Sequence, residues 1–147
     1  MTDSKELEMW LKYWNQDMNR GLLQLLVLAI IVENDEKNKP PCHGYSITKK
    51  LKKISKETIQ VAAGTIYPLL HRLRDKGLIE ELESSDYEKD RRNPTLYLST
   101  TTGREFLSSM MARWEEITDI VELLKNEIEG EQLSKQEGFN SKGSQEK

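Results

Sequence analysis

A heptad repeat near the C-terminus is the feature that most constrains the fold. Such a seam over three heptads predicts a long helix, residues 101–129, whose apolar side needs a partner helix. That partner is either the N-terminal helix of the same chain or a second copy of the protein. We expect self-association, because a seam this long protrudes beyond a small domain. The seam residues, spaced alternately three and four apart, are Leu107, Met110, Trp114, Ile117, Val121, Leu124 and Ile128.

The N-terminal segment carries a second apolar stripe. Leu7, Leu11, Trp14 and Met18, joined by Trp10, recur at helical spacing and predict an amphipathic helix over residues 4–19. We assign residues 1–20 to a dimer contact. Its expected residues, taken together with those of the C-terminal helix, are Leu11, Trp14, Leu107, Met110, Trp114, Ile117, Val121 and Leu124.

Between these helices the pattern predicts three further helices and a β-hairpin. An apolar run, residues 21–33, reads as a buried core helix, because it is too short for a membrane span of roughly 18 to 20 residues. A polar loop follows at residues 34–44, and then a helix from Tyr45 to Lys56 whose inward stripe is Ile47, Leu51 and Ile54.

A third helix lies within AAGTIYPLLHRLRDKGLI, residues 62–79, and Gly77 is its expected left-handed stop. A hairpin follows, from strands at 78–84 and 95–99 that flank the turn-rich segment SDYEKDRRNP. The last helix begins at one of two caps, either Thr100 or Thr102 with Glu105 three residues on. The fold class is therefore mainly α with a small β-hairpin: a winged helix-turn-helix at residues 21–100.

The third helix presents two chemically different faces. Its inward residues are Ile66, Leu69, Leu70 and Leu73, and a start at Gly64 or Thr65 places Pro68 in the first turn, where a missing N–H costs little. The outward residues are Thr65, Tyr67, Pro68, His71 and Arg72.

Those outward side chains suit the major groove of DNA. Tyr, Thr and His can hydrogen-bond a base edge or a phosphate, Arg can fork onto guanine, and Pro68 offers an apolar ridge for a thymine methyl. Two alternatives stay open: Tyr67 is a half-buried anchor against the second helix, or His71 and Arg72 are ordinary surface residues.

Positive charge is concentrated although the net charge is −3. Residues 42–79 carry eight Lys or Arg against Glu57 and Asp75, and an acidic stretch, residues 80–88, separates them from a basic segment at the expected wing tip. A local basic footprint is typical of a protein that binds a polyanion, while the alternative is a solvated lysine-rich face. The candidate DNA contacts outside the third helix are Lys49, Lys53, Lys89, Arg91 and Arg92.

The same sequence argues against several other classes of protein. It has two histidines, one cysteine, no glycine-rich phosphate loop and no grouping suited to catalysis, so we expect no enzyme, no metal site and no cofactor. One cysteine and no signal peptide indicate a cytoplasmic protein with no membrane partner. Cys42 would need exposure and a lowered pKa for a redox role. Residues 130–147 have little to bury and are expected to form a disordered polar tail.

Four segments in this order resemble the PadR family of winged-helix transcriptional regulators, over roughly residues 20–128. They are GLLQLLVLAII, CHGYSITKKL, AAGTIYPLLHRLRDKGLIE and YLSTTTGREFL. The resemblance implies a homodimeric repressor that binds a palindromic operator in double-stranded DNA and is released by a small aromatic effector. It implies that His43, Gly44 and Tyr45 start the second helix.

The resemblance also suggests roles for three aromatic residues. Tyr97 matches a wing-strand tyrosine that joins the DNA-binding set, and Trp114 matches an aromatic that lines a ligand space in some members. Trp114 and Trp10 are thus the candidates for an effector pocket, although Trp114 as interface core is the simpler interpretation. Ser99 departs from the usual Leu, and Thr95 and Leu96 replace a basic residue before the paired aromatics. The alternative function is a winged helix that binds protein without sequence-specific DNA binding.

Overall fold

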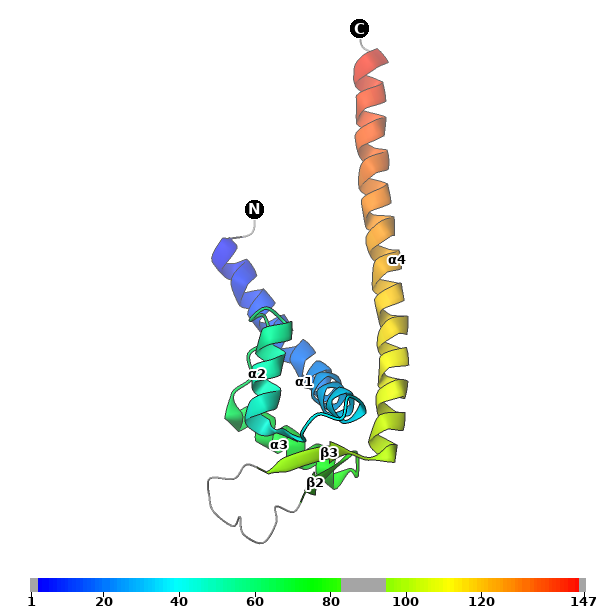
Figure 1. Cartoon of the computed structure of the whole chain (residues 1–147). Coiled ribbons are helices and arrows are strands. Elements are labelled where there is room, and N and C mark those ends of the chain that lie inside the picture. The colour runs from blue at the N-terminus through cyan, green and yellow to red at the C-terminus, as the bar shows by residue number, and fades with distance from the viewer. Residues whose placement is uncertain (1–2, 83–94, 146–147) are drawn as a thin grey trace. The chain divides into compact units, whose positions relative to one another are not determined.

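The computed structural model describes residues 3–82 and 95–145, with side chains given as far as residue 138. The chain forms two units, residues 1–108 and 109–147. Over the described residues, the first unit holds three helices, a small antiparallel sheet and the start of a fourth helix, and the second unit is the continuation of that helix (Figure 1). This confirms the predicted fold class, mainly α with a small β element.

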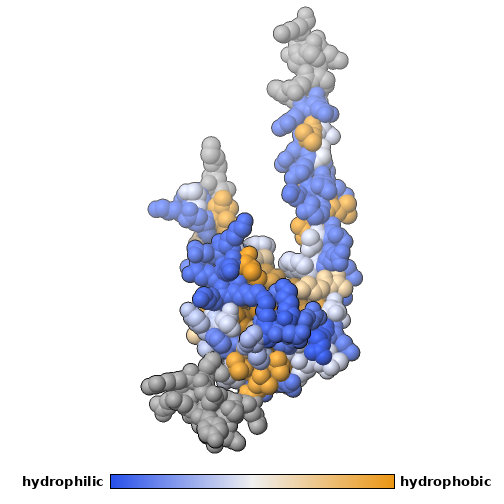
Figure 2. Space-filling model, in the orientation of Figure 1, coloured by the Kyte–Doolittle hydropathy of each residue, from blue (hydrophilic) through white to orange (hydrophobic). Residues whose placement is uncertain are grey.

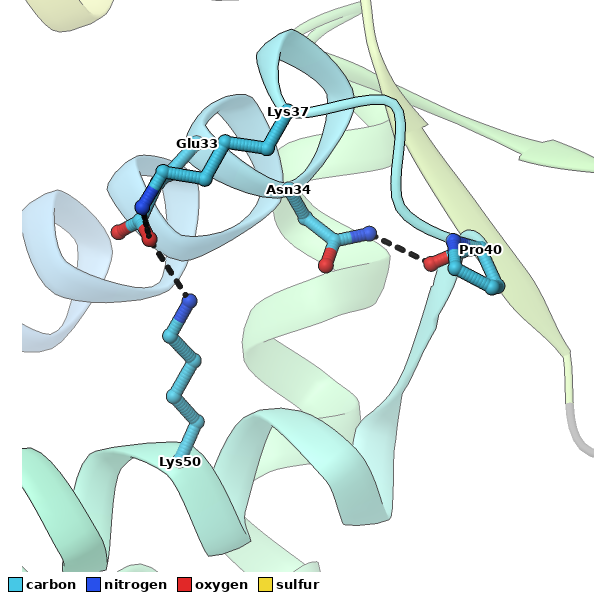
Figure 3. A network of polar contacts seen from close by, with 5 residues as sticks. All are labelled: Glu33, Asn34, Lys37, Pro40 and Lys50. Atoms are coloured by element: carbon cyan, nitrogen blue, oxygen red, sulfur yellow. Dashed lines mark hydrogen bonds and ion pairs between the residues drawn. The ribbon is translucent and has the colours of Figure 1, made fainter.

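The first helix, α1 (Ser4–Glu36), is continuous, so the prediction of separate helices at 4–19 and 21–33 is wrong. Gly21 lies in its interior, and a single glycine there costs only about 1 kcal/mol relative to alanine, which is too little to end a helix. The C-terminal half of α1 is buried, whereas residues 3–17 are all exposed. The loop after α1 is held by Asn34, whose side-chain amide donates to the Pro40 carbonyl over 2.6 Å (Figure 3).

Helix α2 (Gly44–Ile54) begins at a reciprocal cap. His43 Nδ1 accepts from the Ser46 N–H over 3.2 Å, and the Ser46 hydroxyl accepts from the His43 N–H over 3.0 Å. Ile47 and Leu51 are buried as predicted, but Ile54 is 58% exposed. The expectation for Ile54 is wrong because α2 ends at that residue and the chain turns away at Ser55.

Helix α3 (Ala63–Asp75) starts earlier than the sequence predicts, and this changes the position of Pro68. The first intrahelical bond runs from the Ile66 N–H to the Ala62 carbonyl, so residue 68 would donate to Gly64. Pro68 therefore lies inside the helix, at the third donor position of its i→i−4 hydrogen-bond series, and removes a backbone hydrogen bond. The early start has no sequence signal because Ala62 caps without a side-chain hydrogen bond.

The end of α3 matches the prediction for Gly77, whose φ is +74°. The Gly77 N–H donates to the Arg74 carbonyl over 2.9 Å, and the Leu78 N–H donates to the Leu73 carbonyl over 3.0 Å. These are the two bonds of a Schellman motif, which favours glycine at the left-handed position.

The sheet has the strand order β1-β3-β2 and is antiparallel throughout. Strands β2 (Ile79–Leu82) and β3 (Leu96–Ser99) form the predicted hairpin pair, with Ile79 opposite Ser99. Strand β1 (Cys42–His43) pairs with the other edge of β3, with Cys42 opposite Tyr97. The expectation that residues 42–43 lie in a loop is wrong, because two residues are too few for a visible alternation.

Helix α4 (Thr101–Gln145) begins with Thr100 as its cap. The Thr100 hydroxyl accepts from the Gly103 N–H over 2.9 Å and donates to the Gly77 carbonyl over 2.6 Å. Of the two predicted caps, Thr100 is thus the right one. Gly103 allows the close approach of α4 to Leu78, since a Cβ there would lie 1.9 Å from the Leu78 carbonyl oxygen.

The far part of α4 differs from the predicted disordered tail at 130–147, because the helix continues through Gly130 to Gln145. Every described side chain from 111 to 138 is exposed, so packing within the chain does not explain this length. Glu, Gln, Lys and Leu dominate residues 131–137, and these residues have high helix propensity even when they bury nothing.

The core lies where α1, α2, α3 and the sheet meet. Helix α1 packs on α2 and β3, and α3 packs on α2 and β2. The hydrophobic core side chains are aliphatic apart from Tyr97 and Cys42, and those with the least exposure are Val27, Leu28, Ile31, Ile47, Leu51, Ile66, Leu69, Leu70, Leu73, Ile79 and Tyr97.

Candidate nucleic-acid interface

The outer face of α3 is formed by the residues that the sequence predicts. Ile66, Leu69, Leu70 and Leu73 are at most 2% exposed, so they fix the orientation of the helix. The opposite side is open to solvent, and it brings together Thr65, Tyr67, Pro68, His71 and Arg72, all of them exposed. One face of a single helix thus carries two hydroxyls, an imidazole, a guanidinium and a proline ring.

Tyr67 fits both interpretations that the sequence leaves open, since it is exposed on the α3 face and also packs against α2. Its side chain is 41% exposed, yet its ring lies against α2, where a Cβ on Gly44 would come within 2.8 Å of Tyr67 Cε1. Gly44 is therefore the residue that lets the tyrosine ring lie close to the start of α2. The contact also makes the surface continuous from the α3 face to the N-terminal end of α2.

Arg74, at the edge of this face, is already neutralised. Its guanidinium donates to Glu81 of β2 over 2.6 Å and to Asp75 over 3.2 Å. Hydrogen bonds to Glu81 and then Asp75 raise the pKa of Arg74 above its ordinary value. Glu81, one residue of the acidic stretch at 80–88, thus holds an α3 cation in place.

Lys49 and Lys53 are exposed on α2, as predicted. They line a groove of about 760 Å³ between the outer side of α2 and the loop at residues 57–61. The other seven groove residues are absent from the predicted DNA contacts. Glu57, Gln60 and Val61 lie in the loop, and Tyr45, Thr48, Lys52 and Lys56 lie along α2 and just beyond its end. Their spacing of three and four with Lys49 and Lys53 is a signal that could have found them.

Lys50, by contrast, points to the other side of α2. Its ammonium lies 3.1 Å from Glu33 of α1, which also binds Lys37 over 2.8 Å (Figure 3). Hydrogen bonds from Lys37 and Lys50 lower the pKa of Glu33 from 4.5 to about 2. This lysine therefore joins α1 to α2 rather than contributing to the open basic surface.

Tyr97 does not belong to an exposed surface, and its assignment as a DNA contact is wrong. It is 1% exposed in the middle strand of the sheet, where alternate side chains of β3 point into the core. Burial, followed by the charge of Glu81, raises the pKa of the Tyr97 phenol. Lys89, Arg91 and Arg92 lie outside the described residues.

Ser99, which departs from the family pattern, anchors the end of β3. Its N–H and its hydroxyl donate to the Asp35 carboxylate of α1 over 2.7 and 2.6 Å. The Arg104 guanidinium donates to the Ser99 hydroxyl over 3.1 Å. A leucine could make none of these side-chain bonds, so in this chain a polar link replaces the apolar packing that the family pattern implies.

Two exposed apolar stripes lie outside the interface face. On α1, Trp10, Leu11 and Trp14 are 51–63% exposed. On α4, Leu107 and Met110 are half-buried, and Trp114, Ile117, Val121 and Leu124 are 43–57% exposed. Figure 2 shows hydrophobic residues recurring among hydrophilic ones along α4. Exposed apolar side chains gathered in a stripe along a helix are typical of protein–protein contacts.

Cys42 is buried, at 7% exposure. Burial and then the charge of Asp35 raise the pKa of its thiol, which is the opposite of what a reactive thiolate needs. Among the described residues, no three His, Cys, Asp or Glu side chains gather where a metal ion could bind. In the same part of the chain, no helix combines the length and apolar character needed to cross a membrane.

Comparison with known proteins identifies the family. The model of the transcriptional regulator PadR-like family matches residues 27–109, more than half of the chain. A PadR family regulator from Eggerthella lenta has a TM-score of 0.64 at 25% identity, covering 82% of this chain and 96% of that one.

Two further proteins are similar over most of their length. A PadR-like regulator from Bacillus cereus has a TM-score of 0.57 at 29% identity, covering 74% of this chain and 95% of that one. An uncharacterized protein of Lysinibacillus sphaericus is 26% identical over 113 residues, which are 77% of this chain and 96% of the relative. The chain therefore belongs to the PadR-like family of transcriptional regulators, which are DNA-binding proteins and not enzymes.

Proposed function

We propose that this protein is a cytoplasmic homodimer that represses transcription by binding a palindromic operator. The observation that carries the proposal is the face of α3, where all five outward residues are exposed while the four inward ones are buried. A helix oriented in this way presents its side chains to the major groove, where base edges differ in their donors and acceptors.

Within that face we propose distinct roles for the side chains. Arg72 reads a guanine, for which its forked donors are suited, and His71 and Thr65 bond base edges or phosphates. Pro68 contacts a thymine methyl, and Tyr67 donates its hydroxyl to the DNA backbone from its position against Gly44. Lys49 and Lys53 neutralise phosphates, and the basic segment Lys89, Arg91 and Arg92 does the same beside the helix.

The proposed dimer uses the exposed stripes of α1 and α4. In a single chain, seam residues such as Trp114 and Ile117 leave 43–45% of their side chains exposed to water, and a partner helix would cover them. A two-fold dimer places two α3 helices one helical turn of DNA apart, which is why we propose a palindromic operator.

We further propose that a small aromatic compound releases the repressor by stacking on Trp114 and Trp10. Both indoles are exposed in the single chain, so both have a face to offer either to the partner subunit or to a ligand.

The test of the DNA face is a pair of substitutions with a matched control. His71→Ala/Arg72→Ala should weaken binding to the operator at least tenfold, since a bidentate base contact contributes about 1–3 kcal/mol of discrimination. Lys12→Ala, on the exposed N-terminal part of α1, should leave affinity unchanged. A double variant with wild-type affinity and specificity would refute the assignment of α3 and favour a winged helix that binds protein.

The dimer is tested separately by mass. Trp114→Ala should raise the concentration at which dimers dissociate while the far-UV circular dichroism stays the same. If the wild-type protein is a monomer at micromolar concentration, the dimer and the palindromic operator are both wrong.

A further inference from the structure

Polar side chains join three elements of the first unit at a single place. The Asp35 carboxylate, at the end of α1, accepts two hydrogen bonds from Ser99, the last residue of β3. Arg104, in the first turn of α4, donates to the Ser99 hydroxyl and carbonyl over 3.1 and 3.4 Å, and to the Thr101 hydroxyl over 3.2 Å. We call Asp35, Ser99 and Arg104 the Asp35 junction. It lies where β3 leads directly into α4 (Figure 1).

Asp35 is unfavourable for local stability. It lies in the last turn of α1, which holds Glu33, Asp35 and Glu36 and no basic residue, although the negative end of the helix dipole disfavours carboxylates. Its Oδ1 atom is buried and accepts no hydrogen bond from the described residues, which costs further free energy. A residue that breaks such local rules is expected where position or function requires it.

Apolar packing does little to hold the start of α4. In the part of the chain that the structure describes, the extensive contacts between elements involve α1, α2, α3 and the strands, and α4 is not among them. Within the described stretch 101–110, only Gly103 is buried. Polar bonds therefore hold the first turn on two sides. The Thr100 cap ties it to residues 77–78, just after α3, and the Asp35 junction ties it to α1.

The junction also lies on one of the two paths that connect α3 with α1. One path runs through α2, and the other runs through β2 and β3 to α1. Ser99 is at the end of the second path, opposite Ile79, which begins the strand that follows α3. The exposed apolar stripe of α1 lies at the other end of the same continuous helix. The junction thus connects a helix of the proposed dimer to the part of the domain that carries α3.

The chemistry of the junction decides how firmly these parts are placed. Hydrogen bonds fix distance and direction, whereas apolar contacts are non-directional and permit small shifts. The two bonds from Ser99 to the carboxylate, at 2.6 and 2.7 Å, have the short lengths of charge-assisted bonds, which are stronger than neutral ones. A leucine at residue 99, as in the family pattern, would replace the side-chain bonds by apolar contact.

We infer that Asp35 and Ser99 are positioning residues that set the spacing of DNA half-sites which the dimer accepts. This inference rests on the proposed function, because it requires two α3 helices on one palindromic operator. The two side chains hold the sheet and the first turn of α4 to α1 in one arrangement, so the two α3 helices of the dimer keep a fixed separation. Neither residue belongs to the α3 face that meets DNA.

The experiment measures affinity as a function of the spacing between two half-sites. Asp35→Leu/Ser99→Leu replaces both polar partners by apolar ones, a change that is often near neutral for stability. Asp35→Asn keeps the shape and removes the charge, and it takes the place of the double variant if that protein does not fold. Asn34→Ala is the matched control, because it removes the neighbouring bond from α1 to Pro40, which joins neither β3 nor α4.

Each protein is titrated with the native operator, with operators that have one base pair inserted or deleted between the half-sites, and with a single half-site. One inserted base pair moves the half-sites apart by about 3.4 Å and rotates one of them by roughly 35°. The wild type should lose at least about tenfold in affinity on either change, as for a lost base contact. In the junction variants this loss should be smaller by at least about threefold. All proteins should bind the single half-site equally, because the α3 face is unchanged.

The outcomes separate this inference from the proposed function. A weaker spacing dependence in the junction variants, with the wild-type dependence kept by Asn34→Ala, supports the inference. If the junction variants keep the wild-type dependence, whatever their Tm, or if Asn34→Ala weakens it equally, the junction is only structural and the inference is wrong, while the regulator stands. If the wild type binds no operator with two half-sites, the proposed function is wrong and the inference is refuted with it.

Discussion

Gly103→Ala should destabilise the first unit, although alanine has the higher helix propensity. Alanine is the better helix former, so in an ordinary helix interior this change stabilises by up to about 1 kcal/mol. At residue 103 the added Cβ would meet the Leu78 carbonyl oxygen at 1.9 Å, about 1.5 Å short of ordinary contact at 3.4 Å. The Leu78 carbonyl oxygen is a backbone atom, and the backbone fixes the position of the added Cβ. A side-chain rotation therefore cannot relieve the clash.

The magnitude follows from what must move. If Thr100 and the first turn of α4 retreat by that distance, three hydrogen bonds break: the Thr100 hydroxyl to the Gly77 carbonyl, the Thr100 N–H to the Leu78 carbonyl, and the Arg104 guanidinium to the Ser99 hydroxyl. At about 1 kcal/mol each they amount to about 3 kcal/mol. Alanine's helix propensity offsets about 1 kcal/mol of this, leaving a net destabilisation of about 2 kcal/mol.

The assay is thermal and urea unfolding followed by circular dichroism, at one fixed protein concentration because association shifts Tm. A destabilisation of about 2 kcal/mol should lower Tm by roughly 5–8 °C for a chain of this size. Gly21→Ala is the matched control, since no atom lies within 4 Å of its added Cβ, and it should be neutral or stabilising. If Gly103→Ala unfolds at or above the wild-type temperature, the close approach of α4 to Leu78 is wrong.

Three other predictions concern the cap, the ion pair and the thiol. Thr100→Ala should destabilise by about 0.5–2 kcal/mol and Thr100→Ser should not, because only the hydroxyl caps α4; equal unfolding of the two variants would contradict the cap. Glu33→Gln should lower Tm slightly at pH 7, because its pKa of about 2 reflects the bonds from Lys37 and Lys50. Since a lowered carboxyl pKa stabilises above its ordinary value, the difference should fade as pH drops from about 4.5 towards 2, and a difference that persists at pH 2 would exclude this cause. Cys42 should react with a thiol reagent far more slowly in the native protein than in denaturant, whereas equal rates would mean that the thiol is exposed.

The sequence predicts the parts of the fold that depend on local patterns. The periodicity of α3 identifies its buried and exposed sides, because a 100° step per residue leaves little choice once Leu69, Leu70 and Leu73 face inward. Gly77 is predictable as a helix stop because only glycine adopts a left-handed φ at low cost. Thr100 is one of two predicted caps, and the choice between them depends on Gly77, which lies far away in the sequence.

The parts that the sequence does not predict depend on contacts distant along the chain. Strand β1 exists only because Cys42 and His43 pair with β3, which a two-residue pattern cannot reveal. Tyr97 reads equally well as an exposed or a buried strand residue until the sheet has β1 on its other edge. The position of Pro68 depends on where α3 begins, and Ala62 gives no capping signal for that start.

For the candidate site, the exposed residues of α3 are predictable from the sequence, whereas the groove on α2 is not. Lys49 and Lys53 are the visible part of a row whose other members include Lys52 and Lys56. The left-handed turn at Lys56 and Glu57, which brings the 57–61 loop against α2, has no glycine or asparagine to announce it. Whether a lysine of α2 forms an ion pair also depends on which acidic residues lie near it in the fold. Lys50 pairs with Glu33 of α1, and this is a tertiary contact that the sequence pattern does not reveal.

The central claim, a dimeric regulator that reads one DNA site, is tested most directly by titrating the purified protein against DNA from upstream of its own gene. Mass is measured in parallel, and salt and competitor DNA are varied. The account predicts saturable binding by a dimer to one site, in roughly the nanomolar range of specific protein–DNA complexes and resistant to non-specific competitor. A dimer that binds this DNA no better than competitor, and that selects no site from a genome-wide pool of fragments, would contradict it.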